Sequence, residues 1–308
     1  METTENKKIL WPELDFLKMQ DTIETLHQWI QIVGKIRLKA MPWQNHSWHT
    51  TLYISPNGFS THGIPYDGRI LQIEFDFRKH KLIIQFSDSD TMVIDLYSRT
   101  VADFYEELFA KLDSIGVHVK IHPKPNELEH TIPFMENTMN KTYDPNVAFA
   151  LWQAMLKANQ VFTQFRSEFI GKVSPIHLFW GAFDLAVTRF SGQKAPLHPG
   201  GMPNIPLEVM QEAYSQEVSS AGFWPGSKGF PQPVFYSYVY PTPEQFAKQI
   251  VLPEQAYYSP EMGEFFLKYA DVQKAENPEK MLYDFLVTTY NAAAVSASWN
   301  RESLEKSI

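Results

Sequence analysis

Four long segments of the chain carry apolar residues every three or four positions, which is the spacing of a buried helix face. Asp144 and Pro145 form a typical helix start ahead of the third segment, and Gly171 is typical of the position just past a helix end. The helices predicted in this way cover residues 21–38, 100–115, 146–170 and 278–299, with shorter ones at 207–214 and 260–269.

Between the first two helices the period changes to two, which is typical of strands with one buried face. Turn-forming residues at Pro56-Asn57-Gly58 and Asp67-Gly68 separate these short apolar runs. They predict an antiparallel meander over residues 48–54, 58–64, 70–77, 81–86 and 92–96, followed by a strand at 117–121 after the second helix. Later β-rich runs lie at 176–190 and 234–240, with an extended run up to residue 223.

The proline-punctuated polar segment at 123–145 has no period. It predicts a boundary or a long crossing loop that connects two halves, residues 1–122 and 146–308. The predicted fold class is α+β: two packed halves, each an antiparallel meander sheet backed by a long helix, with a helical C-terminal tail. Similar phrases end the long helix of each half, around Gly34-Lys35 and Gly171-Lys172. An internal duplication is therefore one interpretation of the chain.

Residues 173–243 form the most unusual segment, because they hold 10 of the 21 prolines and 7 of the 14 glycines but only seven charged residues. A loop-rich segment normally faces water, yet this one is rich in Phe, Trp and Tyr. Irregular backbone that is buried must satisfy its own peptide groups. We therefore expect residues 173–243 to wall a ligand pocket or to form an interface.

The formal charge of −8 is spread over both halves of the chain, and neither half is basic. Binding to nucleic acid or to an anionic membrane is not expected without a basic surface. The chain has no cysteine, which excludes disulfides and thiolate chemistry and favours a cytoplasmic protein. The sequence shows neither a signal-peptide core nor an apolar run of membrane-spanning length.

Three candidate site residues lie in the β-rich run 176–190: His177, Asp184 and Arg189. A continuous strand would place His177 and Arg189 on one face and Asp184 on the other, whereas a break at Gly181 would turn Asp184 toward His177. His177 would then be an acid–base group oriented by Asp184, and Arg189 would bind an anionic group. The alternative is a buried Asp184–Arg189 ion pair, with His177 hydrogen-bonded to backbone.

Further candidates surround this run. Glu217 stands among small hydroxyl and aromatic residues, where desolvation would raise its pKa and make it a third candidate catalytic group. Alternatively, Glu217 pairs with Arg189 or Lys228. His198 is held between prolines in a rigid loop that could contact a ligand. The remaining candidate ligand contacts are Trp48, His49, Trp180, Tyr214 and Trp224.

No metal site is predicted, and the sequence identifies no cofactor. Both the P-loop motif and the dinucleotide-binding fingerprint are absent. The alternative is a zinc site at His46 and His49, which would share one face of a helix. Pro42 and the β-rich residues that follow argue against a helix there, and residues three apart on a strand point in opposite directions.

Several of these phrases resemble a bacterial protein family described only as a domain of unknown function. The resemblance extends from residue 11 to the tail, and its most specific phrases are residues 26–35, 45–49, 75–77, 174–192, 198–201 and 217–226. It implies no activity. In that family a His often precedes the glutamate, at the position where Gln216 stands here. This departure weakens any metal or proton-relay role for position 216.

The residues together predict a small-molecule-binding protein, with the features of an enzyme, that acts on a small anionic or aromatic metabolite through a pocket of His, carboxylate and Arg side chains. The alternative is a non-catalytic module in which the same aromatic loops form a homodimer or a partner interface. A concave cavity would favour the first hypothesis, and a flat exposed aromatic patch would favour the second.

Overall fold

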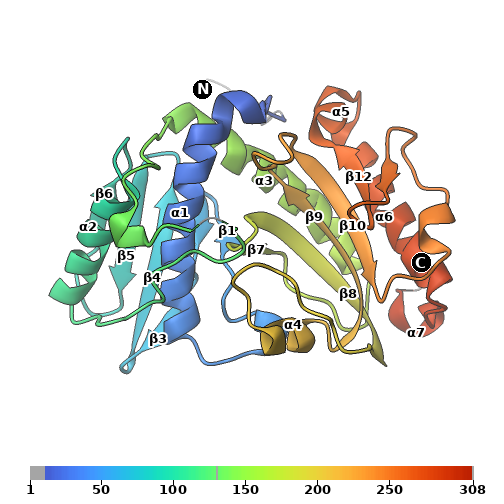
Figure 1. Ribbon diagram of the computed structural model, residues 1–308, viewed down its shortest axis with the longest axis horizontal. Coiled ribbons are helices and arrows are strands. Elements are labelled where there is room, and N and C mark those ends of the chain that lie inside the picture. The colour runs from blue at the N-terminus through green and yellow to red at the C-terminus, as the bar shows by residue number, and fades with distance from the viewer. Residues whose placement is uncertain (1–10, 130, 307–308) are drawn as a thin grey trace, which may run out of the picture.

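The structure is a computed structural model that describes residues 11–129 and 131–306. It contains two six-stranded antiparallel sheets, one in each half of the chain, with helices packed against them (Figure 1). The α+β class predicted from the sequence is therefore confirmed. None of the described helices is both long enough and apolar enough to cross a membrane.

The N-terminal sheet has the strand order β1-β2-β4-β5-β6, and β3 pairs with β4. Helix α1 runs across this sheet, and α2 packs beside α1 and β6 (Figure 1). The elements of this half are α1 (Phe16–Ala40), the 3₁₀-helix η1 (Asn45–Ser47), β1 (Tyr53–Ile54), β2 (Gly58–Ser60), β3 (Ile64–Tyr66), β4 (Arg69–Asp76), β5 (Lys81–Phe86), β6 (Met92–Asp95), α2 (Val101–Ser114) and η2 (Phe134–Glu136).

The C-terminal sheet has the strand order β11-β12-β10-β9-β8-β7, and helices α3 and α6 pack against it. The elements of this half are α3 (Pro145–Ser167), β7 (His177–Phe179), β8 (Asp184–Lys194), α4 (Leu207–Ala213), β9 (Gln216–Trp224), β10 (Val234–Tyr240), η3 (Phe246–Lys248), β11 (Tyr257–Ser259), β12 (Glu264–Lys268), α5 (Tyr269–Lys274), α6 (Pro278–Ser296) and α7 (Arg301–Leu304).

Register separates the two faces of the C-terminal sheet, because directly opposed residues project from the same face. Leu185 and Phe235 both oppose Phe223, and all three are fully buried on the side of α3 and α6. Ala186 and Tyr236 both oppose Gly222 on the other side. Figure 1 shows this second side turned toward the viewer, with α3 behind the sheet, and we call it the open face.

The two sheets meet along their edge strands. Leu52, next to β1, and Leu178, in β7, form an antiparallel bridge, and the two residues exchange backbone hydrogen bonds of 3.0 and 2.8 Å. One apolar core cluster extends from Trp11 to Leu304 and draws residues from both halves. The sheet edges therefore satisfy each other's backbone groups at a seam between the halves.

Side-chain caps are seen at the starts of two of the predicted helices, α2 and α3. The Thr100 hydroxyl accepts a hydrogen bond from the Asp103 backbone, and the Asp144 carboxylate accepts one from Asn146. The first helix begins earlier than predicted, because α1 starts at Phe16 and not at residue 21.

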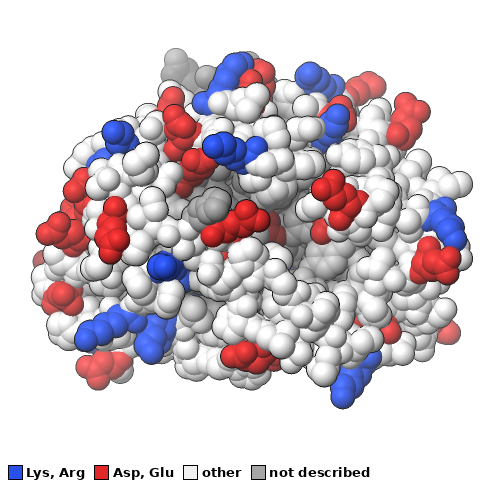
Figure 2. All heavy atoms as spheres, in the orientation of Figure 1, with Lys and Arg blue, Asp and Glu red and all other residues white. Residues whose placement is uncertain are grey.

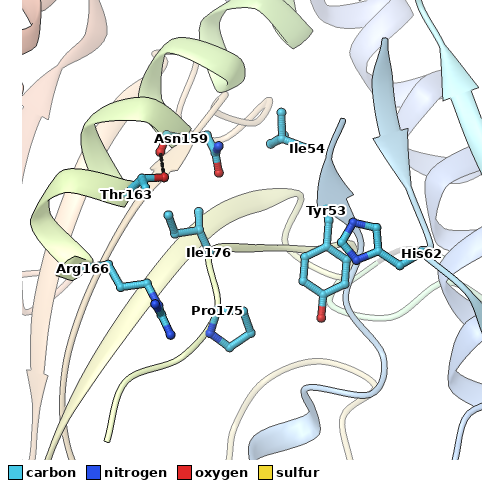
Figure 3. Close-up of a pocket in the computed structure, with 8 residues that line it drawn as sticks. All are labelled: Tyr53, Ile54, His62, Asn159, Thr163, Arg166, Pro175 and Ile176. Atoms are coloured by element: carbon cyan, nitrogen blue, oxygen red, sulfur yellow. Dashed lines mark hydrogen bonds between the residues drawn. The ribbon is translucent and has the colours of Figure 1, made fainter. Parts of the chain in front are cut away.

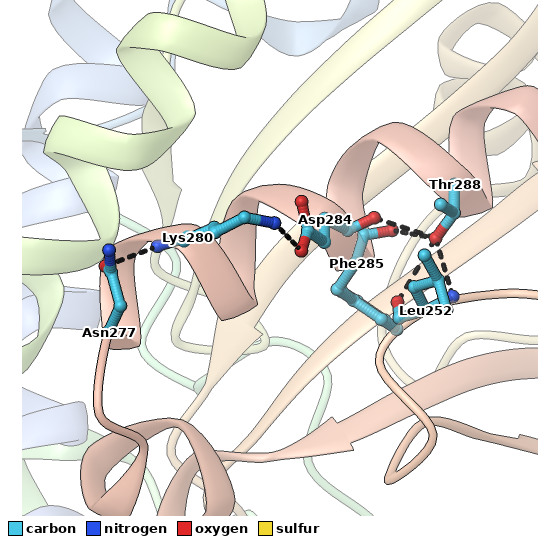
Figure 4. Close-up of polar contacts among 6 residues, drawn as sticks. All are labelled: Leu252, Asn277, Lys280, Asp284, Phe285 and Thr288. Atoms are coloured by element: carbon cyan, nitrogen blue, oxygen red, sulfur yellow. Dashed lines mark hydrogen bonds and ion pairs between the residues drawn. The ribbon is translucent and has the colours of Figure 1, made fainter.

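Helix α6 starts with a cap of its own, in which the Asn277 side chain accepts a hydrogen bond of 3.0 Å from the Lys280 backbone (Figure 4). Lys280 pairs with Asp284 one turn later, and the Thr288 hydroxyl accepts a hydrogen bond of 2.9 Å from the backbone of Leu252. The bond between Leu252 and Thr288 ties the loop before β11 to the helix that backs the sheet.

Two predicted elements were wrong. Residues 117–121 form no strand, and the predicted helix at 260–269 is instead the end of the β11–β12 hairpin and the start of α5. Strand β12 lies between β10 and β11, and both of its faces are covered. Phe265 and Leu267 are buried in the main core, whereas Phe266 is buried in a small apolar cluster on the open face. A continuous apolar run suits a strand that is covered on both faces, and periodicity alone does not distinguish it from a helix.

The expectation that residues 173–243 are irregular was also wrong, because β7, β8, β9 and β10 all lie in this segment. Its aromatic and β-branched residues occupy the strands, whereas most of its prolines and glycines lie in the connections. The peptide groups are satisfied mainly by the ladder between neighbouring strands.

Candidate functional site

The open face of the C-terminal sheet contains a hollow near the middle of the molecule, with acidic side chains on both sides (Figure 2). Asp184 is the first residue of β8, Glu264 is the first residue of β12, and β10 contributes alternate residues Tyr236 and Tyr238 to the same face. Glu127 belongs to the segment that connects α2 to η2. We call this set the acidic hollow.

Tyr236 is positioned by the absence of a side chain at Gly222. A β-carbon at position 222 would lie 2.4 Å from the Tyr236 ring and 2.6 Å from the Leu185 carbonyl oxygen, so only glycine leaves room for the ring. The Tyr236 hydroxyl donates a hydrogen bond to the Asp184 carboxylate. Tyr238 lies nearly parallel to Tyr236, with 6.1 Å between ring centres. The hydroxyls of Tyr238 and Tyr214 are 2.8 Å apart.

Glu127 is held in an unusual backbone conformation. Its φ angle is +59°, in the left-handed region that residues with a side chain rarely adopt. Its amide donates a hydrogen bond of 2.9 Å to the Pro203 carbonyl. The carboxylate packs against Gly181, where a β-carbon would lie 1.9 Å from one of its oxygens. Strain of this kind persists only where surrounding contacts impose it.

Helix α1 supplies those contacts. The Gln31 side-chain amide pairs with both backbone groups of Asn126, through bonds of 2.9 and 2.8 Å, and the Lys35 ammonium contacts the Asn126 side chain. The His27 Nε2 atom lies 2.8 and 2.9 Å from the carbonyl oxygens of Trp180 and Gly181. One face of α1 therefore fixes both the loop that carries Glu127 and the turn that precedes Asp184.

The three carboxyl groups of the hollow have raised pKa values. Burial raises the pKa of Glu127 and of Glu264 to about 7, and in both cases the negative charge of Asp184 adds to the effect. Burial raises the pKa of Asp184 to about 6, against the hydrogen bond from Tyr236, which lowers it. None of the ion pairs within residues 11–129 and 131–306 includes any of these carboxylates.

The tyrosines of the hollow stay protonated at neutral pH. Burial raises the pKa of Tyr214 to about 12 and raises the pKa values of Tyr236 and Tyr238 well above the usual range. The hollow therefore combines carboxyl groups that can gain or lose a proton near pH 7 with neutral hydroxyls that can donate hydrogen bonds.

Several of the residues predicted from the sequence lie on or beside the open face. Asp184 is in the hollow itself, and the Tyr214 hydroxyl bonds to Tyr238 at its edge. His198 stacks on Tyr214 with 4.6 Å between ring centres. Trp224 belongs to a small apolar cluster on this face, separate from the main core, and stacks on Phe230.

His177 shares the face of Asp184, because it opposes Ala186 in the ladder between β7 and β8. Its ring is fully buried edge-on to Phe179, and neither ring nitrogen has a hydrogen-bond partner within the described residues. Burial lowers the pKa of His177 to about 4, so its ring is neutral at pH 7. The predicted bond from this ring to backbone is therefore not seen.

Arg189 and Glu217 lie on the other face of the sheet, toward α3 and α6. Arg189 packs 3.5 Å above the Phe165 ring and donates to the Phe165 carbonyl. The predicted ion pairs of Arg189 with Asp184 and of Glu217 with Arg189 or Lys228 are absent from the described part of the chain. The physical reason is register, since Asp184 and Arg189 are five residues apart on one strand and project from opposite faces.

Trp180 lies in the core, where it packs on Gly34 of α1 and donates a bond of 2.8 Å to the Thr50 carbonyl. The predicted contacts Trp48 and His49 belong to the segment around η1, which docks on α4. Trp48 packs against Phe190 there. Trp180, Trp48 and His49 are therefore not part of the acidic hollow that contains Asp184.

The segment around η1 gives the zinc alternative no ligand set. His46 has a left-handed backbone, so His46 and His49 share no helix face. The His46 Nδ1 atom lies 2.9 Å from the Ala213 carbonyl oxygen, and the His49 Nδ1 atom lies 3.2 Å from the Gln44 amide. Within the described residues, no group of three or more His, Asp or Glu side chains could hold a metal ion.

Glu127, Tyr236, Tyr238 and Glu264 were not among the residues predicted from the sequence. The alternating tyrosines of Val234–Tyr240 were a usable signal, because a polar hydroxyl on every second residue of an apolar strand marks one face. Glu264 gave a weaker signal at the edge of an apolar run. Nothing local distinguishes Glu127 from the exposed glutamate two residues later.

Comparison with known protein families shows which family the chain belongs to. Residues 11–306 match a family of unknown function, DUF5996, and the chain belongs to this family. The expected resemblance to a domain of unknown function is therefore confirmed over nearly the whole chain. No curated protein and no solved structure matches the chain.

Proposed function

We propose that this member of the DUF5996 family binds a small organic cation, an amine or a quaternary ammonium, in the acidic hollow. The observation that supports the proposal is the gathering of Glu127, Asp184 and Glu264 without a cationic partner within the described residues. Like charges that raise one another's pKa are relieved when a positive charge binds between them.

The aromatic side chains of the hollow favour the same class of ligand. The faces of tyrosine and tryptophan rings attract cations, most strongly where water is excluded. Tyr236 and Tyr238 present neutral rings and hydroxyls to the hollow, and Trp224 lies on the same face. A small anion is less well suited, because Arg189 faces the other side of the sheet.

The hollow is also suited to proton transfer, and in the proposed enzyme Glu127 and Glu264 are the general acid and base. A catalytic acid or base works best when its pKa is close to the working pH. Both groups meet this condition, with pKa values of about 7. Asp184 accepts a hydrogen bond from Tyr236, and in the proposed enzyme its negative charge orients the bound cation between Glu127 and Glu264.

A thermal-shift screen tests the proposal. Choline, tetramethylammonium and a series of primary amines are compared at pH 7.5 with neutral compounds of the same shape. We expect cations to raise the melting temperature and neutral compounds to leave it unchanged. The double variant Glu127→Gln and Glu264→Gln should lose most of the shift, because it removes two of the charges without changing side-chain shape.

Glu129→Gln is the matched control, because Glu129 is an exposed carboxylate on the same loop. It should bind cations as the wild type does. Equal shifts in the wild type and the double variant would contradict the proposal, and so would a screen in which only neutral or anionic compounds bind.

One observation favours the alternative of an interaction module. Three apolar side chains near the α4 end of the molecule are largely exposed, Leu197 at 75%, Met202 at 42% and Leu207 at 49%. If they form a homodimer interface, sedimentation analysis should give a dimer that Leu197→Ser and Leu207→Ser convert to a monomer. A monomeric wild type would remove this alternative.

The cytoplasm is our proposed location. The absence of cysteine supports it, because such a chain needs no oxidising compartment to fold. Imaging of a tagged full-length protein, with cell fractionation, tests this assignment.

A further inference from the structure

A second concave site lies at the seam between the two halves, away from the acidic hollow. It is a groove of about 430 Å³ between β1 and α3 (Figure 3). Its eight lining residues are Tyr53, Ile54, His62, Asn159, Thr163, Arg166, Pro175 and Ile176. The volume falls in the range of sites for small ligands, and such sites often lie where two parts of a chain meet.

One face of α3 supplies the polar side of this seam groove. Asn159, Thr163 and Arg166 are spaced four and three residues apart, so they line up along the helix. The Thr163 hydroxyl donates a bond of 2.7 Å to the backbone carbonyl of Asn159. The side-chain amide of Asn159 makes no hydrogen bond within the described residues. Figure 3 shows this amide projecting into the space between α3 and β1.

Arg166 is oriented by the opposite wall. Its Nε atom donates a bond of 2.6 Å to the Ser174 carbonyl, in the segment that leads to Pro175 and Ile176. Its two terminal nitrogens make no ion pair and no hydrogen bond within residues 11–129 and 131–306. A guanidinium fixed at Nε with both terminal nitrogens free presents donors to a planar or tetrahedral oxyanion.

The remaining walls are apolar and aromatic. Ile54, Pro175 and Ile176 form one part, and the Tyr53 ring stacks on the His62 ring with 4.2 Å between centres and 1° between planes. Arg37 lies 5.6 Å from the centre of the Tyr53 ring and adds positive charge behind this wall. The negative charge of Glu74 raises the pKa of His62. The Glu74 carboxylate accepts a hydrogen bond from Ser55 and does not line the groove.

We infer that the seam groove binds a small oxyanion, a carboxylate or a phosphoryl group, attached to a compact apolar body. Arg166 binds the anionic head, the Asn159 amide donates a further hydrogen bond, and the wall of Ile54, Pro175 and Ile176 covers the apolar part. No acidic side chain lines the groove to oppose an anion. The inference is independent of the proposed cation site, because the two sites share no residue.

Isothermal titration with phenyl phosphate, benzoate and neutral benzamide tests the inference. At least one of the two anions should bind, and benzamide should bind at least tenfold more weakly, roughly the effect of one charge-assisted contact. Phenyl phosphate as the tighter ligand identifies a phosphoryl site, and benzoate as the tighter ligand identifies a carboxylate site.

Two variants locate the binding. Arg166→Gln should weaken binding of the anion at least tenfold. Asn159→Asp should weaken it independently, because it places a negative charge at the groove. Asn159→Asp leaves the bond between Arg166 and Ser174 intact, so it remains informative if Arg166→Gln unfolds. Arg78→Gln, at an exposed turn arginine, is the charge-matched control and should bind as the wild type does.

Failure of both anions to bind, equal binding of benzamide, or anion binding that neither variant weakens would overturn the inference. An unchanged melting temperature and far-ultraviolet circular dichroism spectrum in the Asn159→Asp protein show that the fold is intact, whether or not the acidic hollow binds cations.

Discussion

Glu127 stands out among the single residues, because three separate features constrain it. Its backbone is in the left-handed region, its carboxyl group packs on Gly181, and its pKa is raised to about 7. The left-handed backbone and the burial of an ionised carboxylate both cost stability, and neither is needed to form the sheet. Residues that are costly to stability are often retained for function, and Glu127 is the first residue to test.

Replacement of this carboxyl group should stabilise the protein at high pH. The pKa of Glu127 is about 7 in the folded chain against an ordinary value of 4.5, so the folded state holds the proton more tightly. The contribution of this group to stability is therefore full below pH 4.5 and is lost as the pH rises through 7. Glu127→Gln should match the wild type near pH 4.5 and exceed it by up to about 3 kcal/mol at pH 8.

Urea unfolding of both proteins at each pH gives this difference. Burial lowers the pKa values of His27 and His177 to about 4, so their contributions to stability increase as the pH rises. Comparison of the two proteins at the same pH cancels these contributions. A constant difference between pH 4.5 and 8 would show that the Glu127 pKa is not raised.

Gly222→Ala tests the packing of the tyrosine in the hollow. The added methyl group would meet the Tyr236 ring and the Leu185 carbonyl at less than normal contact distance. We expect a loss of about 1–3 kcal/mol in the free energy of unfolding, together with weaker cation binding. Gly229→Ala is the control, since a β-carbon there meets only the Ser227 side chain at 3.9 Å. An unchanged stability would mean that Tyr236 can move without cost.

Among the elements, α1 has a role beyond covering its own sheet. Through His27, Gln31 and Lys35 it holds a loop of the connecting segment and the β7–β8 turn, which lie far away in sequence. This face of the helix is polar and buried, so its side chains must find partners inside the protein. The helix therefore couples the first half of the chain to the carboxyl groups of the hollow.

Gln31→Ala should release the loop that carries Glu127. The substitution leaves the backbone amide and carbonyl of Asn126 without their partner, at a cost of about 1–3 kcal/mol. Amide hydrogen exchange should rise in residues 122–129, and cation binding should weaken. Gln20→Ala is the control, because the Gln20 side-chain amide bonds to Glu24 within α1 and not to the loop. Protection of this loop that is the same in wild type and Gln31→Ala would show that other contacts hold it.

At the scale of the whole molecule, the two halves share one core. The apolar cluster runs through both sheets, and the bridge between Leu52 and Leu178 joins their edges. The predicted boundary at 123–145 is therefore a crossing segment, and one of its residues, Glu127, contributes to the hollow in the other half.

A shared core predicts one cooperative unfolding transition for the whole chain. Far-ultraviolet circular dichroism and tryptophan fluorescence should give the same urea midpoint, and residues 1–144 produced alone should not fold stably. Two separated midpoints, or a folded fragment with native-like circular dichroism, would show that the halves are independent.

Local sequence determined much of the framework. The helices α2, α3 and α6, the caps at Thr100 and Asp144, and the strands of the first meander follow from periodicity, capping and turn residues, because each depends on neighbours close in sequence. The same signals gave the α+β class. They failed at 260–269, where a run of apolar residues fits a strand and a helix equally well.

Only the tertiary structure decided which residues meet at a site. Strand register turned Asp184 and Arg189 to opposite faces, and it placed Tyr236 beside Asp184 although 52 residues separate them. Glu127 and Glu264 joined this group through a loop held by α1 and an edge hairpin. The physical reason is that the burial and charge of a side chain depend on partner strands far away in sequence, which no local pattern specifies.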